Sequence, residues 1–400
     1  MKLNMNEFMN KNNNDSNEEN DNTYSFENWE DLDVNMQLLR GINAFGFAFP
    51  SPIQKKGIKP ILEGKDVIAQ AQSGTGKTGA FSIGSIGIIQ DSNDGQVLII
   101  SPTRELSKQT FKVVGGISAL MKNINSQLLI GGTDTQYDIE QYNTNKPQIL
   151  IGCPGRVQEL LRRNVINGKN VRLIVLDEAD EMLSGGFKEQ IYNIFQYLKN
   201  DVQVALFSAT LPDELKSITE KFMRNPVEIY VKRDKLTLEG ITQYHINVED
   251  DYSKYTTLKD LFARISASQC IIYANSIKRV KDLYEAMMAD GFPVCCIHSG
   301  MEKTERNDAY DNFIEGRYKV LISTNITARG IDIQQVSTVI NFDIPKDTHT
   351  YIHRIGRSGR WGRKGMGINF VTRRDYRKLK EIENYYDTYI PALPANFTIS

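Results

Sequence analysis

A short string near residue 75 has the composition of a loop that binds phosphate groups. It reads Ala71-Gln-Ser-Gly-Thr-Gly-Lys-Thr78 and follows an apolar, β-branched run. Its glycines allow successive backbone N–H groups to curve round a triphosphate, while Lys77 can reach the β- and γ-phosphates and Thr78 can ligate Mg²⁺. A plain Gly-rich turn is the alternative, although such a string arises by chance in only about one chain in a hundred of this length. The residues predicted to bind the nucleotide here are Ser73, Gly74, Thr75, Gly76, Lys77 and Thr78.

A group of carboxylates follows another apolar run later in the chain. The run Leu173–Leu176 leads directly into Asp177-Glu-Ala-Asp180. Because the carboxyl ends of parallel strands meet at one edge of a sheet, these carboxylates should face the same crevice as the phosphate loop. Asp177 is predicted to complete the Mg²⁺ site and Glu178 to polarise the attacking water. The alternative is an acidic helix N-terminus that only favours the helix dipole.

Strands and helices that alternate along the chain must position these groups. Short β-branched runs predict strands at Asp66–Ala71, Val97–Ser101, Gln148–Cys153, Leu173–Asp177 and Val202–Phe207, and then at Thr242–Val248, Cys270–Tyr273, Val294–Ile297, Val320–Ser323, Val339–Phe342 and Ile368–Val371. Longer mixed segments such as Ile277–Ala289 predict helices between them. The fold class is therefore α/β, with parallel sheets covered on both faces. Three glycines in the helix after the phosphate loop, Gly79, Gly84 and Gly87, are expected to allow close packing of that helix on the sheet.

Composition divides the chain into four segments. Residues 1–23 hold nine Asn and five acids, which predicts a disordered tail without a targeting signal. The strand–helix alternation stops at the polar stretch Lys232–Gly240 and then restarts. We therefore predict a first, ATP-binding domain at 24–232, a flexible linker at 233–240 and a second domain at 241–400.

Overall composition excludes several classes of protein. Hydrophobic residues make up 40% and charged residues 24% of 400 residues, and no apolar run is long enough to span a bilayer. The four cysteines form no CxxC, which argues against a zinc ribbon or a redox motif, and 400 residues are too many for a small disulfide scaffold. The sequence predicts a protein of a reducing compartment. The cytoplasm is the favoured location, and the nucleus is the alternative.

In order and spacing, the chain from about Trp29 onward resembles the DEAD-box RNA helicase family. The resemblance rests on Gly46-Phe47 with Gln54, on the two motifs above, on Pro102-Thr-Arg-Glu-Leu106, and on His353-Arg-Ile-Gly-Arg-Ser-Gly-Arg360. It implies two tandem RecA-like domains of the P-loop NTPase type, ATP and Mg²⁺ as cofactors, and RNA-stimulated ATP hydrolysis. Within the family, the segment Leu236–Ile241 and the absence of large appendages are similar to the translation initiation factor subgroup.

The resemblance also implies roles in ATP chemistry. Gln54 would pair with the adenine edge, and Trp29 would stack on the base. Asp332 would hold the ribose. Arg357 and Arg360 would act as arginine fingers toward the γ-phosphate, joining Lys77, Asp177 and Glu178 as catalytic residues.

The remaining motifs resemble those that contact RNA or couple hydrolysis to strand separation. The implied RNA contacts are Arg104, Gly132, Cys153, Arg156, Arg306 and Thr324. Ser208, Thr210 and His353 would couple the two activities. Three positions depart from the family pattern: Cys153 replaces Thr, Lys303 replaces Gln, and Asn325 replaces Asp. A small buried thiol is the alternative interpretation of Cys153.

The expected substrate is RNA, as a single strand or a short duplex, without sequence preference. The net charge is −1, yet residues 351–380 carry ten Lys/Arg and one acid. We therefore predict phosphate and sugar recognition by local basic surface. The favoured function is an ATP-dependent helicase, expected to be a monomer with a scaffold protein as a further partner. An ATP-gated RNA clamp with little unwinding activity is the main alternative, and a P-loop kinase leaves the second domain unexplained.

Overall fold

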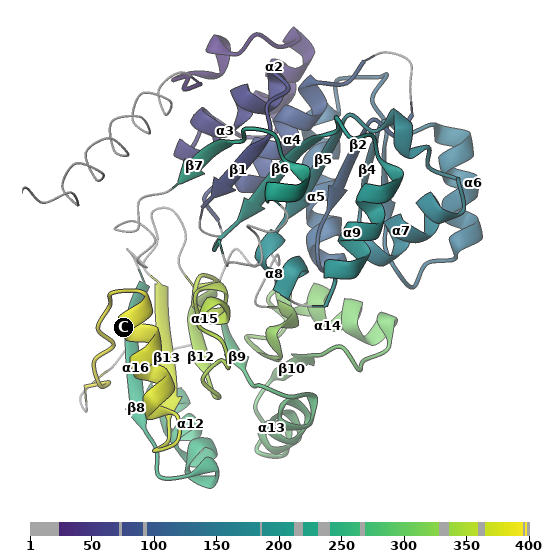
Figure 1. The fold of residues 1–400 in the computed structure, drawn as a ribbon. Helices are drawn as coiled ribbons and strands as arrows, with labels where there is room; N and C mark the ends of the chain where they lie inside the picture. Colours follow the sequence, from purple (N-terminus) through teal and green to yellow (C-terminus); the bar gives the residue numbers. More distant parts are fainter. Residues whose placement is uncertain are drawn as a thin grey trace, which may run out of the picture. The chain divides into compact units, whose positions relative to one another are not determined.

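The structure is a computed structural model that describes residues 24–71, 74–90, 94–184, 186–211, 219–230, 241–264, 269–327, 336–358, 365–394 and 397. Residue contacts divide the chain into two compact units (Figure 1), one formed by Met1–Ala71 with Thr75–Tyr230 and the other by Val231–Ser400 with Gln72–Gly74. The predicted tail at 1–23 and the predicted linker at 233–240 lie outside the described residues, so the proposed domain boundaries stay a prediction.

The first unit is built on a seven-stranded parallel sheet in the order β3-β4-β2-β5-β6-β1-β7. Its strands are β1 (Val67–Gln70), β2 (Val97–Ile100), β3 (Ser126–Leu129), β4 (Ile149–Gly152), β5 (Leu173–Asp177), β6 (Gln203–Ser208) and β7 (Val227–Tyr230). Its helices are α2 (Met36–Ala44), α3 (Pro52–Leu62), α4 (Lys77–Gly87), α5 (Arg104–Ser118), α6 (Thr135–Asn145), α7 (Pro154–Arg162), α8 (Ala179–Ser184) and α9 (Lys188–Tyr197), with short 3₁₀ helices at Trp29–Asp31 and Gly168–Asn170. The five central strands match the five predicted runs to within two residues at either end.

The second unit is built on a six-stranded parallel sheet in the order β10-β11-β9-β12-β13-β8. Its strands are β8 (Ile241–Asn247), β9 (Gln269–Tyr273), β10 (Val294–Ile297), β11 (Val320–Ser323), β12 (Val336–Asn341) and β13 (Gly365–Val371). Its helices are α12 (Asp251–Arg264), α13 (Ile277–Ala289), α14 (Lys303–Ile314), α15 (Thr348–Ile355) and α16 (Tyr376–Tyr385), with a 3₁₀ turn at Asn325–Thr327. All six strands and α13 were predicted, and the α/β class with two parallel sheets is confirmed.

Each sheet is buried by helices on its two faces. In the first unit, β2, β4 and β5 have no exposed residue, and their side chains join a cluster with Val157, Leu160 and Ile191 from α7 and α9. In the second unit, one cluster joins Tyr273 to Tyr351 and Leu379, and a second covers the other face around Leu258 and Val280. Burial on both faces explains why the strands read as continuous apolar runs.

The glycines of α4 serve a different purpose from the one the sequence predicts. A Cβ at Gly84 would lie 2.7 Å from the side chain of Ile61, and one at Gly87 would lie 2.4 Å from that of Leu62. Both partners belong to α3, so the expectation of close helix-to-sheet packing is wrong. The glycines lower intrinsic helix stability but allow two helices to pack closely on one face of the sheet.

Candidate active site

The phosphate loop has the backbone conformation that its glycines predict. Gly74 and Gly76 adopt positive φ angles of 83° and 101°, and α4 begins at Lys77 directly after them. Residues with a Cβ rarely adopt these angles, so both positions favour glycine. Thr75 and Thr78 lie in the same strand–loop–helix unit, while Ser73 lies outside the described residues.

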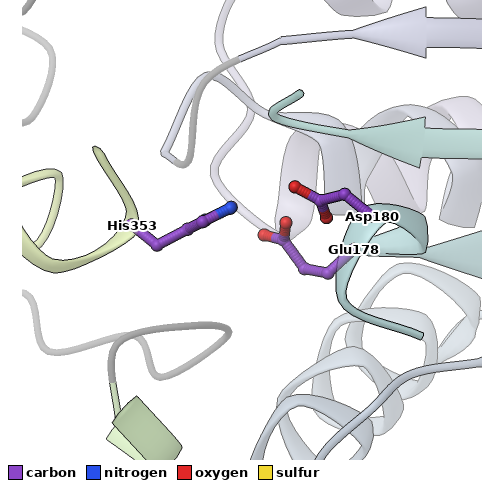
Figure 2. A group of neighbouring side chains, drawn as sticks. All are labelled: Glu178, Asp180 and His353. Atoms are coloured by element: carbon purple, nitrogen blue, oxygen red, sulfur yellow. The ribbon is translucent and has the colours of Figure 1, made fainter. Parts of the chain in front are cut away.

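The ammonium of Lys77 faces the carboxylate pair after β5. Its Nζ lies 3.5 Å from Oε1 of Glu178, and both side chains are at most 6% exposed. Glu178 has a positive φ of 52°, which is strained for a residue with a Cβ and stabilised here by surrounding structure. Burial, reinforced by the neighbouring Glu178 charge and opposed by Lys77, raises the pKa of Asp177 to about 7. Figure 2 shows the Glu178 and Asp180 side chains, which lie just before and within the first turn of α8.

The charged groups at the end of β5 have a surplus of carboxylates, which a divalent cation would neutralise. Asp177, Glu178 and Asp180 are all buried at the end of β5, and Lys77 is the single buried ammonium that the structure describes beside them. A hydroxyl from Thr78 and a carboxylate from Asp177 are oxygen ligands, the kind that Mg²⁺ prefers. The residues present therefore fit the predicted metal.

The segment after β6 is bonded to the same carboxylates. Thr210 Oγ1 donates a hydrogen bond to Asp180 Oδ2 at 2.6 Å, and the Asp180 backbone N–H donates to Ser208 Oγ at 3.3 Å. The two predicted coupling residues in this unit thus contact one acid next to the Lys77–Glu178 pair. Asp180 itself was not predicted as a site residue, although its place in the acidic string was a usable signal.

The predicted adenine motif lies against the phosphate loop. The Gln54 side chain is 2% exposed, its Oε1 accepts from the Ser51 backbone N–H at 2.8 Å, and its Nε2 donates to the Gly76 carbonyl at 3.3 Å. Trp29 is buried, and its indole N–H donates to the carbonyl of Phe47 at 2.8 Å. Base pairing by Gln54 and base stacking by Trp29 stay predictions.

The predicted RNA contacts of the first unit follow three neighbouring strands. Arg104 begins α5 after β2, and its guanidinium lies against Gly132, which follows β3 with a φ of 85°. Cys153 follows β4, and its Sγ lies 3.7 Å from the hydroxyl of Ser107. These positions face one edge of the sheet.

Arg156 is held by the protein itself. Its guanidinium is buried, forms an ion pair with Asp138, and donates to the carbonyl of Thr133 at 2.9 Å. It thereby fixes the loop that carries Gly132. Asp138 was not predicted, because a single acid on a polar helix carries no sequence signal.

The strand order separates two sets of residues along one edge of the first sheet. The nucleotide groups follow β1, β5 and β6, which are adjacent, whereas the predicted RNA contacts follow β3, β4 and β2. Since all strands are parallel, both sets lie at the carboxyl edge. One edge therefore offers a phosphate site and, beside it, a second site.

The second unit carries the remaining predicted residues. His353 and Arg357 are buried, and Arg357 Nε donates to the carbonyl of His353 at 3.3 Å. Arg306 lies on α14 and Thr324 directly follows β11. Lys303 begins α14, while Asp332 and Arg360 lie outside the described residues.

Asn325, one of the three residues that differ from the family pattern, contacts a buried arginine. Its Oδ1 accepts from Arg354 Nε at 2.9 Å and from Nη2 at 2.5 Å. Arg354 also donates to the side chains of Asn275 and Asn341 and to the carbonyl of Asp343. Burial lowers the pKa of Arg354 to about 10. These four acceptors are neutral, so no carboxylate contacts this guanidinium directly among the described residues.

Comparison with protein families matches both halves of the chain. Residues 51–218 match the DEAD/DEAH box helicase model, and residues 253–362 match the helicase conserved C-terminal domain. The chain is 48% identical over 369 residues to eukaryotic initiation factor 4A of Caenorhabditis elegans, covering 92% of this chain and 91% of that protein. It is also 48% identical over 376 residues to the ATP-dependent RNA helicase eIF4A of Kluyveromyces lactis, covering 94% of each.

Solved structures agree with this assignment. The chain resembles S. cerevisiae Dbp5 bound to RNA and ADP BeF3, with a TM-score of 0.86 and 34% identity over 93% of this chain and 96% of that one. It also resembles Mss116p bound to ssRNA and AMP-PNP, with a TM-score of 0.84 and 26% identity over 94% of this chain and 81% of that one. The tandem RecA-like fold is confirmed. Within the described ranges, every helix is too short or too polar to span a bilayer.

Proposed function

We infer that this chain is an ATP-dependent RNA helicase that acts in translation initiation, because it belongs to the DEAD-box helicase family and, within it, to the eIF4A subgroup. The observation that carries this is the carboxyl edge of the first sheet, where Lys77 faces Glu178 and the predicted RNA contacts follow the adjacent strands. The Kluyveromyces lactis relative is named an ATP-dependent RNA helicase, and this name favours the helicase over the RNA clamp.

The residues of this chain divide the chemistry among them. The phosphate loop and Lys77 bind the triphosphate, and Glu178 orients and polarises the attacking water. Mg²⁺, held by Thr78 and Asp177, would neutralise phosphate charge. Arg357 and Arg360 would stabilise the charge that develops in phosphoryl transfer. Ser208 and Thr210 would transmit the state of this site to RNA through Asp180.

We also propose the finer features of the activity. RNA is bound through phosphates and sugars, at Arg104, Gly132, Cys153, Arg156, Arg306 and Thr324. The two units close on ATP and RNA together, locally separate a short duplex, and reopen after hydrolysis. A scaffold protein and a cytoplasmic location would fit translation initiation.

The test compares nucleotides and active-site variants in one assay. RNA should stimulate hydrolysis of ATP but not GTP, because Gln54 matches the adenine edge. Lys77→Ala should lose nucleotide binding, whereas Glu178→Gln should keep binding and lose hydrolysis. Release of a labelled strand from a short duplex separates a helicase from a clamp. Equal turnover of ATP and GTP, or RNA binding without strand release, would contradict the proposal.

A further inference from the structure

The basic segment at residues 351–380 divides into a buried part and an exposed part. Arg354 is 0% exposed and Arg357 is 5% exposed, so neither side chain belongs to the solvent-exposed basic surface. Arg373, Arg374 and Arg377 are exposed, with 91% of the Arg377 side chain accessible. The proposed nucleotide chemistry does not use these three arginines.

The turn between β13 and α16 presents two of them to solvent. β13 ends at Val371, and because its neighbours are parallel to it, the turn lies at the carboxyl edge of the second sheet. The Thr372 backbone N–H and hydroxyl donate to Asp375 Oδ2 at 3.1 and 2.7 Å, which fixes the turn. Within the described part of the chain, Arg373 and Arg374 form no hydrogen bond or ion pair.

Side-chain contacts connect this turn to the segment after Thr324. Asn325 accepts from Arg354, whose Nη1 donates to the carbonyl of Asp343 at 2.7 Å. Asp343 Oδ1 lies 3.1 Å from Lys254 Nζ, which in turn lies 3.9 Å from Asp375 Oδ2. This series of contacts therefore connects the segment after Thr324 to the turn that carries Arg373 and Arg374, along the carboxyl edge of the second sheet.

The helix α16, which follows β13 (Figure 1), begins with an exposed aromatic ring, and another lies four residues after its end. Tyr376 is 50% and Tyr389 is 74% exposed. Lys380 Nζ lies 5.5 Å from the ring centroid of Tyr376 and 5.9 Å from that of Tyr389. Surfaces that combine cations with exposed aromatic rings bind single strands, because phosphates pair with the cations and bases stack on the rings.

We propose that Arg373, Arg374, Tyr376 and Arg377, the α16 surface, bind single-stranded RNA that continues past the predicted contact at Thr324. This inference rests on the proposed function. Three strand spacings separate β11 from β13, a distance of about 14 Å, so a strand bound at Thr324 reaches the α16 surface only if it is long enough. The surface recognises phosphates and base faces and reads no sequence.

The test measures RNA affinity as a function of RNA length. The double variant Arg373→Gln/Arg374→Gln should bind a single strand of about 20 nucleotides roughly three- to tenfold more weakly, and bind one of about 8 nucleotides normally. Its log–log salt slope for the long RNA should fall by about 1.4, which is about 0.7 for each lost phosphate contact. The matched control is Arg317→Gln/Lys319→Gln, which removes two exposed cations at the opposite edge, just before β11.

The aromatic contact has its own pair of variants. Tyr376→Ala should weaken binding of the long RNA at least about fivefold, and Tyr376→Phe should restore it because a phenyl ring also stacks on bases. If neither the double arginine variant nor Tyr376→Ala changed the affinity or the salt slope for the long RNA, the proposal that the α16 surface binds RNA would be wrong. If unaltered protein also failed to show ATPase stimulation by the short RNA, the proposed function itself would fail, and the short oligomer distinguishes the two outcomes.

Discussion

The Thr210 hydroxyl donates a hydrogen bond to the carboxylate of Asp180 at 2.6 Å, and this bond joins the segment after β6 to the start of α8. Asp180 lies two residues after Glu178, whose carboxylate faces Lys77. A change at the nucleotide can therefore reach the segment after β6 through one buried hydrogen bond.

Thr210→Val should remove this bond while keeping the shape of the side chain. Because Asp180 would lose its hydroxyl partner, we expect ATP hydrolysis to continue and strand release per ATP to fall several-fold. Removing one partner of a buried hydrogen bond costs about 1–3 kcal/mol, so the melting temperature should also fall. Thr210→Ser keeps the hydroxyl and should behave like the unaltered protein. Equal loss of hydrolysis and unwinding in Thr210→Val would argue against a coupling role.

Gly79→Ala should damage the adenine motif. A Cβ there would lie 2.5 Å from Gln54 Nε2 and 3.0 Å from the ring of Phe47, so Gln54 must move. We expect a loss of about 1–3 kcal/mol of stability and a reduced preference for ATP over GTP. Gly115→Ala is the matched control, because nothing lies within 4 Å of a Cβ on that helix position. It should stabilise the protein by about 0.5–1 kcal/mol and leave nucleotide preference unchanged.

Cys153→Thr should affect both stability and RNA binding. Cys153 is the N-cap of α7, has extended backbone angles and provides no side-chain capping bond. A threonine hydroxyl can cap the helix, which is worth about 1 kcal/mol. If this position also contacts an RNA phosphate, affinity should rise about fivefold, equivalent to about 1 kcal/mol. Thermal melting and RNA titration measure the two effects.

Cys153→Asp separates these effects. Aspartate is as good an N-cap as threonine, so the variant should also gain stability. Its charge would repel phosphate, so RNA affinity should fall if the position contacts RNA. Unchanged RNA affinity in both variants would show that Cys153 is only a half-buried thiol.

The sequence predicts the central strands of both sheets because they are buried on both faces. β3 and β7 were not predicted, since each is a four-residue edge strand with partly exposed side chains and no continuous apolar run. The phosphate loop and Asp177–Glu178 were predictable because their chemistry requires particular residues next to strand ends.

Contacts between distant segments were not predictable in the same way. The ion pair of Arg156 with Asp138 joins α7 to α6, and the glycines of α4 face α3. Such contacts depend on how the helices pack, and neither segment carries a local pattern that names its partner. Resemblance located Arg156, but the structure was needed to show that protein groups hold its guanidinium.

Asn325→Asp should strengthen the second unit. Arg354 is buried and bonded to neutral oxygens, so a carboxylate at 325 would supply a charge-assisted partner at an already formed contact. Because Asn325 is exposed to solvent, we expect a gain of only about 1 kcal/mol, or an increase of roughly 2–4 °C in melting temperature. The gain should shrink as salt is added, because an exposed charge is screened.

Asn341→Asp is the informative comparison for that variant. Asn341 also accepts from Arg354, at 3.1 Å, but its Nδ2 donates to Asn369 Oδ1 at 2.8 Å and the side chain is fully buried. A carboxylate here would place two oxygens against each other and bury a charge, so we expect destabilisation. If both aspartates changed stability by the same amount, the effect would come from the added charge alone. Opposite signs, measured by thermal melting of the intact chain, would show that the geometry of the Arg354 contacts decides the outcome.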